Sequence, residues 1–132
     1  SLAHYIDDPY MPVVEREPLT DHVDVALVGG GFAGLIAGGR LREAGVEKIR
    51  VLDKAGDFGG TWYWNRYPGA QCDTAAFVYL PLHEETGHMP SENYTHAPEN
   101  LEHSRRNGRH FDLYDNALFS PEVTGRDWDA DA

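Results

Sequence analysis

The chain has 132 residues, the length of one ordinary domain, and its 22 acidic against 11 basic side chains give a formal net charge of −11. A charge of this sign disfavours nucleic acid and anionic membranes as partners. The single cysteine, Cys72, permits no disulfide within the chain and favours a reducing compartment, the cytoplasm. No run of residues is apolar for long enough to suggest a transmembrane helix.

Residues 1–22 are rich in proline and in acidic side chains. Pro9, Pro12 and Pro18 each fix φ and remove a donor, so neither a helix nor a central strand is expected. We predict an extended N-terminal arm that lies on a domain beginning at residue 23, with apolar side chains such as Tyr10 and Met11 as anchors. A partly disordered tail without a role in chemistry is the alternative interpretation.

A glycine-rich turn between two apolar runs organises the rest of the chain. Residues 23–28 are almost continuously apolar, which is typical of a buried parallel strand, and 32–44 have helical spacing that ends at Gly45. Residues 47–52 predict a second strand, which Asp53 follows. The turn itself, residues 29–34, reads GGGFAG, a G-x-G-x-x-G pattern. Strand, turn, helix, strand and acid thus occur in the order of a dinucleotide site.

Each position in this pattern has a physical reason. Gly29 allows the tight turn, Gly31 lets the backbone approach a pyrophosphate, and Gly34 lets the helix pack close to the sheet. The helix start then presents N–H groups to the phosphates. The carboxylate of Asp53 can accept hydrogen bonds from both ribose hydroxyls, which favours FAD or NAD over NADP at this site. The residues predicted to bind the dinucleotide here are Gly29, Gly31, Phe32, Ala33, Gly34, Asp53 and Lys54. An NAD domain unrelated to flavin would fit the same pattern.

The run that follows, residues 59–73 (GGTWYWNRYPGAQCD), closely resembles a landmark of the flavin-dependent Baeyer-Villiger monooxygenases, class B flavoproteins that use FAD and NADPH. The resemblance continues through residues 79–82, 94–114 and 119–128, and so covers nearly the whole chain. It implies an α/β fold: a Rossmann-like three-layer FAD-binding domain with a parallel sheet, of which residues 23–132 would be the N-terminal portion. Members of the family are much longer and carry an NADP domain that is absent here, so we expect an incomplete domain and enzyme.

The resemblance also implies roles for single residues. Backbone N–H groups near Gly60 would face the flavin and its phosphates, and Trp62 and Trp64 would form a wall of the isoalloxazine site. Asp73 is implied to be catalytic, because the family's aspartate holds an arginine of the NADP domain that stabilises the peroxyflavin. The cofactor residues implied in this part are Gly60, Thr61, Trp62, Tyr63, Trp64, Gln71, Cys72, Asp73, Tyr79 and Val123, with Gln71 and Cys72 toward NADPH and Val123 at the adenine.

The same residues have plainer interpretations. Clustered aromatic residues such as Trp62 and Tyr63 more often form core than cofactor contacts, and an aspartate after a glycine- and proline-containing loop, like Asp73, more often caps a turn. A nucleophilic role for Cys72 is not expected, because nothing in the chain marks a base paired with it. The histidines at 83, 88, 96, 103 and 110 match no compact ligand spacing, so we predict no metal site and expect solvated side chains.

The remaining elements are predicted as follows. Residues 55–68 are predicted to form a loop, and residues 98–111 a helix with a thin apolar face, mainly Leu101 and Phe111. The basic residues at 105, 106 and 109 would form a solvated face of that helix. Residues 118–124 predict a third parallel strand, and 126–129 the start of an antiparallel meander.

The sequence therefore predicts the FAD-binding portion of an NADPH-dependent Baeyer-Villiger monooxygenase. By family resemblance, O2 adds at the flavin C4a and the peroxyflavin inserts one oxygen into a ketone, which gives an ester or lactone. The partners would be a small ketone and O2, with a companion chain as one source of the NADP domain. A non-catalytic flavin-binding fragment or subunit, and a related N- or S-oxidising flavin monooxygenase, are the alternatives. We expect that these 132 residues alone cannot complete the cycle.

Overall fold

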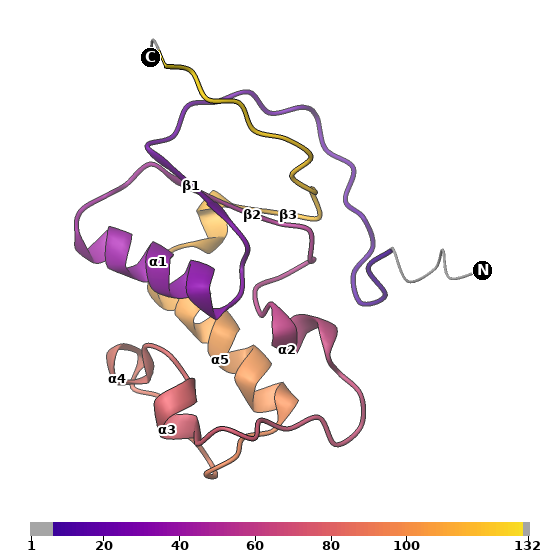
Figure 1. Ribbon diagram of the computed structural model, residues 1–132, viewed down its shortest axis with the longest axis vertical. Helices are drawn as coiled ribbons and strands as arrows, with labels where there is room; N and C mark the ends of the chain where they lie inside the picture. Colours follow the sequence, from indigo (N-terminus) through magenta and orange to yellow (C-terminus); the bar gives the residue numbers. More distant parts are fainter. Residues whose placement is uncertain (1–6, 131–132) are drawn as a thin grey trace.

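A three-stranded parallel sheet with helices on one side forms the frame of the protein (Figure 1). The computed structural model describes residues 7–130, so residues 1–6 of the predicted arm and residues 131–132 lie outside the described part. The strands are β1 (Val25–Val28), β2 (Ile49–Asp53) and β3 (Ala117–Phe119), in the spatial order β1-β2-β3. The predicted Rossmann-like α/β fold with a parallel sheet is confirmed.

Two longer helices and several short ones connect the strands. Helix α1 (Phe32–Glu43) joins β1 to β2, and α5 (Ala97–His110) precedes β3. The short elements are α2 (Thr61–Trp64), α3 (Ala76–Tyr79), α4 (His83–Thr86) and the 3₁₀ turn η2 (Tyr114–Asn116). Helices α1 and α5 contact each other below the sheet (Figure 1). No helix of residues 7–130 is long and apolar enough to cross a membrane.

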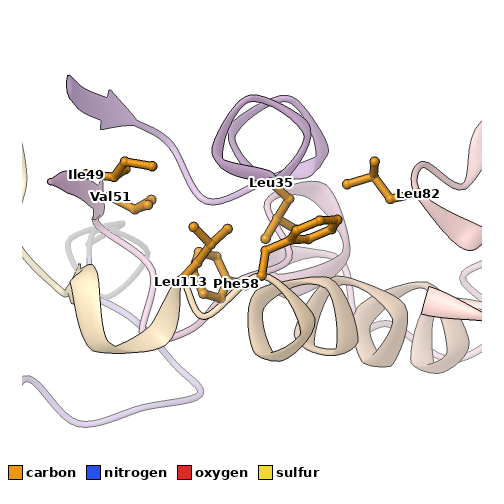
Figure 2. Packing of buried hydrophobic residues seen from close by; sticks show 7 residues of the cluster. Leu35, Ile49, Val51, Phe58, Leu82 and Leu113 are labelled. Carbon is orange, nitrogen blue, oxygen red and sulfur yellow. The ribbon is translucent and has the colours of Figure 1, made fainter. Parts of the chain in front are cut away.

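The main core lies between the sheet and these helices. Ile49 and Val51, which alternate with more exposed residues along β2, point toward Leu35 of α1 and toward Leu113 (Figure 2). Gly38 and Gly39 of α1 allow close packing, since a Cβ on Gly38 would lie 2.8 Å from Leu113 Cδ1 and one on Gly39 would lie 3.1 Å from Phe111 Cδ2. The opposite face of the sheet is less covered, and Val28 there is 70% exposed. The described residues thus form the sheet and one helical layer.

Three predictions of secondary structure need correction. The predicted loop 55–68 contains helix α2, which is held by tertiary contacts that no local pattern shows. The third strand ends at Phe119 rather than continuing to residue 124, because Ser120 has φ +74° and a proline follows it. Residues 126–129 form no strand, and Trp128 there is 92% exposed. A strand needs a paired neighbour, and none of residues 7–130 provides one for this segment.

The two residues of the thin apolar face predicted for α5, Leu101 and Phe111, are buried, but most of the other buried side chains of this helix are polar. Asn100, His103, Ser104 and Asn107 are all fully buried. Their hydrogen bonds explain why burial is tolerated: for example, Asn100 Nδ2 donates to the Thr95 carbonyl oxygen at 3.1 Å. The predicted solvated basic face is wrong for two residues: Arg105 is only partly exposed and pairs with Asp57 at 2.8 Å, and Arg106 is only partly exposed with a buried Nη1.

The expectation of solvated histidines is wrong for His88, whose side chain is only 11% exposed, and for His103. The His103 side chain is fully buried, and its Nε2 lies 2.6 Å from the Pro81 carbonyl oxygen. Since a carbonyl only accepts, Nε2 carries the proton. The ring stacks on His88, with 4.8 Å between centroids. Burial lowers the pKa of His103 to about 4, against a partial opposing effect of the Pro81 bond.

We expect the free energy of unfolding to decrease as the pH falls from about 6.5 toward about 4, because unfolded His103 gains a proton over this range and the folded protein resists it. Urea unfolding at about pH 7 and about pH 5 measures this decrease. His103→Gln should make it smaller, whereas His110→Gln, at the exposed end of α5, should leave it unchanged. An unaltered pH dependence in His103→Gln would contradict the assignment.

Candidate cofactor-binding site

The turn between β1 and α1 has a geometry that depends on glycine. Gly29 has φ +109°, and a Cβ on Gly34 would lie 1.9 Å from the Gly29 carbonyl oxygen. Helix α1 therefore starts directly against the end of β1. Its N-cap is Gly31, no side chain caps its first turn, and that turn carries no acidic residue. The first N–H groups of α1 are thus available to an anion such as a phosphate.

A second glycine pair packs against this turn. The N–H of Gly59 donates to the Gly30 carbonyl oxygen at 3.0 Å, and a Cβ on Gly60 would lie 2.8 Å from the Gly31 Cα. Gly60 is also the N-cap of α2. The structure thus brings together two motifs that are far apart in the sequence, with backbone against backbone.

Asp53 fixes the end of β2 at the same place. Its Oδ2 accepts a hydrogen bond from the Gly30 N–H, and its Oδ1 accepts one from the Ala55 N–H at 2.8 Å. The carboxylate lines a hollow of about 260 Å³ with Gly29, Lys54 and Val123. Asp53 and Val123, predicted to lie at the ribose and at the adenine, therefore line one hollow with Gly29 at the carboxyl ends of β1 and β2, whereas Gly31 and the start of α1 are not among its lining residues.

The aromatic residues of α2 extend the site away from this hollow. Trp62 is buried, and its Nε1 donates to Tyr79 Oη at 3.1 Å. The Tyr79 ring also meets Phe32, the first residue of α1, edge to face with 5.3 Å between centroids. Burial, in part opposed by the Trp62 bond, raises the pKa of Tyr79, so its hydroxyl stays protonated at neutral pH. Trp62, Tyr79 and Phe32 thus form one packed unit beside the phosphate turn.

The other two aromatic residues of α2 lie differently. Tyr63 is fully buried: its hydroxyl bonds to Asp8 of the arm and its N–H donates to the Gly60 carbonyl oxygen at 3.0 Å, so this predicted cofactor residue exposes no group to a ligand. Trp64 is half-buried, with Lys54 Nζ 5.7 Å from its ring centroid. Thr61 is exposed at the start of α2. Helix α2 therefore buries two residues, Trp62 and Tyr63, and leaves Thr61 and part of Trp64 at the surface.

The segment 71–73 is partly tied to the start of α5. Gln71 pairs with His96 in an antiparallel bridge, and its Nε2 donates to the Tyr94 carbonyl oxygen at 2.6 Å. Cys72 is buried. Asp73 is exposed, and no residue between 7 and 130 makes a hydrogen bond or ion pair with its carboxylate. Asp73 is therefore available to a cationic group from elsewhere.

Sequence reasoning missed a larger hollow of about 550 Å³ on the other side of the aromatic run. Trp62, Tyr67, His96, Pro98 and Leu101 are among its lining residues. The only signal for it in the sequence is the proline and tyrosine content of the segment after α2. Of the predicted cofactor residues only Trp62 reaches it. Within residues 7–130, no group of three or more potential metal ligands is found.

Comparison with known proteins decides the family. A family model described as an NAD(P)-binding Rossmann-like domain matches residues 27–117. The chain belongs to this family.

Several relatives of this Rossmann-like chain are Baeyer-Villiger monooxygenases by name. A Baeyer-Villiger monooxygenase of Streptomyces coelicolor is 53% identical over 129 residues, which are 97% of this chain and 21% of that protein. Neopentalenolactone D synthase of Streptomyces avermitilis is 52% identical over 132 residues, 99% of this chain and 22% of that protein. The predicted resemblance is confirmed, and the chain spans about a fifth of the length of these relatives.

Solved structures of monooxygenases are also similar to this chain. A polycyclic ketone monooxygenase from the fungus Thermothelomyces thermophila superposes with a TM-score of 0.77 and 41% identity, over 86% of this chain and 19% of that one. OTEMO, solved in complex with FAD and NADP, superposes with a TM-score of 0.71 and 30% identity, over 80% of this chain and 20% of that one.

The close approach at Gly34 leads to a prediction for stability. We expect Gly34→Ala to lower the free energy of unfolding by about 2 kcal/mol or more, because the added methyl group must push α1 off the turn. Thermal unfolding followed by circular dichroism measures the change. Gly125→Ala is the matched control, since no atom lies within 4 Å of a Cβ placed there. Equal melting temperatures for the two variants would show that the turn is not tightly packed.

Proposed function

We propose that the chain is the FAD-binding N-terminal part of a Baeyer-Villiger monooxygenase, which uses NADPH and O2 to convert a ketone into an ester or lactone. The observation that carries this proposal is the contact between the two glycine turns, in which Gly59 N–H donates to the Gly30 carbonyl oxygen at 3.0 Å. It joins the dinucleotide fingerprint to the run that resembles these enzymes. The names of the relatives support the same reaction.

The residues present fit FAD. The uncapped start of α1 offers N–H groups for the diphosphate, at a turn where a Cβ on Gly34 would collide with the Gly29 carbonyl oxygen. Asp53 keeps acceptor capacity for the ribose beyond its two backbone bonds, and Val123 lies in the same hollow for the adenine. Trp62 and Trp64 would then lie along the flavin. Bound FAD would supply the electron transfer and oxygen activation that side chains lack.

The chain's own contribution to the reaction is placement, charge and exclusion of water. The packed unit of Trp62, Tyr79 and Phe32 gives the site a rigid apolar wall, which strengthens electrostatic interactions near it. Asp73 would hold an arginine of an NADP domain in place and keep it ionised. Gln71 and Cys72 would lie toward NADPH. A companion chain is one source of that domain, and the lone buried Cys72 supports a cytoplasmic location.

A non-catalytic flavin-binding fragment or subunit is the second candidate. An N- or S-oxidising flavin monooxygenase differs in substrate rather than in cofactor, so only product analysis separates it from the first proposal.

The test uses the full polypeptide that the gene encodes. We expect heat-released flavin to be FAD, and NADPH oxidation to rise when a cyclic or polycyclic ketone is added, with a product that has gained one oxygen as an ester. An amine and a sulfide serve as comparison substrates. Oxidation of these alone would favour the related monooxygenase. FAD binding without NADPH oxidation would favour the non-catalytic subunit, and a protein that binds no flavin would overturn the proposal. The 132-residue chain alone should show no steady ketone-dependent NADPH oxidation.

Asp53 provides a prediction specific to the ribose site. We expect Asp53→Asn to weaken FAD binding about tenfold or more, because an amide supplies one acceptor oxygen where the carboxylate supplies two, and hydrogen bonds to a charged group contribute about 1.5–3 kcal/mol. Flavin fluorescence during titration of the apoprotein measures the dissociation constant. Asp115→Asn, at an exposed position in η2, is the control. Unchanged affinity in Asp53→Asn would place the ribose elsewhere.

A further inference from the structure

One carboxylate of the N-terminal arm bonds to both sides of the loop between β2 and α2. Asp8 Oδ1 accepts hydrogen bonds from the N–H groups of Tyr10 at 2.9 Å and Met11 at 3.3 Å, which close a turn of the arm on itself. Asp8 Oδ2 accepts one from the Gly56 N–H at 2.9 Å and one from Tyr63 Oη at 2.5 Å. Gly56 lies three residues after β2 and Tyr63 lies within α2, so Asp8 joins the arm to the loop that begins the flavin-site run.

These bonds are charge-assisted at neutral pH. Burial, reinforced by Asp8, raises the pKa of Tyr63 to about 12, so the phenol stays protonated and donates a hydrogen bond to Asp8. Burial alone would raise the pKa of Asp8, but the bonds from Tyr63, Tyr10, Met11 and Gly56 outweigh it and hold the pKa below its usual value. A carboxylate acceptor and a neutral phenol donor form one of the stronger kinds of hydrogen bond.

The arm also closes over α2 by aromatic packing. Tyr10 Oη donates to the Trp64 carbonyl oxygen at 3.2 Å, and the Tyr10 ring meets the Tyr63 ring edge to face, with 5.7 Å between centroids. The Arg66 guanidinium lies 4.0 Å from the Tyr10 ring centroid and 4.5 Å from that of Tyr63. The last turn of α2 is thus enclosed between the arm and Arg66.

The space at Gly56 shows that the arm is closely fitted to the loop. Gly56 has no positive φ, so its backbone conformation does not require glycine. A Cβ there would, however, lie 2.4 Å from Met11 Cβ and 2.7 Å from Tyr63 Oη. Glycine at this position is therefore explained by the approach of the arm.

The arm reaches the neighbourhood of the cofactor hollow. A hollow of about 310 Å³ is lined by Asp8, Val13, Lys54, Trp64 and Glu122, among others. Lys54 and Glu122 also line the hollow that contains Asp53. One wall of the space next to the predicted adenosine site is therefore made by the arm.

We propose that Asp8 is a positioning residue of the flavin site. Helix α2 has four residues and no side-chain cap, so its orientation depends on tertiary contacts rather than on its own stability. Asp8 supplies such a contact through Tyr63, and thereby sets Trp62, Trp64 and the Gly60 turn against the phosphate-binding turn. Asp8 itself touches no cofactor. The inference rests on the proposed function, because it concerns the binding of FAD.

The test compares arm variants of the full polypeptide. We expect Asp8→Asn to weaken FAD binding about tenfold, because the amide presents an N–H donor where Gly56 and Tyr63 both donate. The visible absorption bands of the FAD that remains bound should shift, because Trp62 and Trp64, which are proposed to lie along the flavin, would be displaced. Tyr63→Phe, which removes one hydroxyl and keeps the ring, should have a similar effect. The double variant should bind FAD no more weakly than the single variant with the lower affinity. Glu15→Gln, an exposed carboxylate on the same arm, is the control and should bind FAD normally.

The outcomes separate this inference from the proposed function. Wild-type protein that binds no flavin would overturn both. Wild-type protein that binds FAD, with Asp8→Asn equal to it in affinity and spectrum, would overturn the inference alone, even if the melting temperature falls. If Asp8→Asn does not fold, Tyr63→Phe decides: normal affinity and spectrum would overturn the inference, and weakened binding with shifted bands would support it.

Discussion

The contact between two bare-backbone turns is the constraint on which the rest of the structure depends. Gly31 and Gly60 approach so closely that a Cβ on Gly60 would lie 2.8 Å from the Gly31 Cα. This distance leaves no room for a side chain, and it fixes where β1 ends, where α1 starts and where α2 starts. Asp53 adds the end of β2 to the same junction through the Gly30 N–H. A diphosphate site needs such a junction, because only backbone donors can converge on it without side chains between them.

The loop that carries Gly60 is held from two sides. On one side, α5 and η2 support it: Arg105 of α5 pairs with Asp57, Tyr114 of η2 donates to the same carboxylate at 2.8 Å, and a Cβ on Gly108 would lie 2.6 Å from Phe58 Cδ2. On the other side lies the arm with Asp8. The buried polar face of α5 bonds elsewhere, through Asn100 to Thr95 and through His103 to Pro81, and these hydrogen bonds fix the position of the helix that carries Arg105.

The parts of the fold predicted from the sequence are those in which local pattern and tertiary structure agree. Between Val25 and Asp53, the regular spacing of apolar residues and the glycines at the turns are local signals, which extend over only a few residues. The positions of these elements were therefore predicted closely. Helix α2 was missed because four residues carry no periodicity. His103 was wrongly expected in solvent because its burial is set by Pro81 and by the stacked His88, neither of which its spacing reveals. The role of the arm was hidden for the same reason, since nothing local connects Asp8 with Tyr63.

Two aspartates of the candidate site show how environment divides their roles. Asp53 receives backbone N–H groups on both oxygens, so its carboxylate is held in one orientation, which suits the recognition of a neutral sugar by geometry. Asp73 is exposed and has no hydrogen-bond or ion-pair partner among residues 7–130, so its carboxylate is accessible to the arginine proposed for it. Exchanging these environments would disable both functions: a mobile carboxylate would not distinguish a ribose hydroxyl from water, and a saturated one would attract an arginine only weakly. The same side chain can therefore bind a cofactor at one end of the site and hold a charged partner at the other.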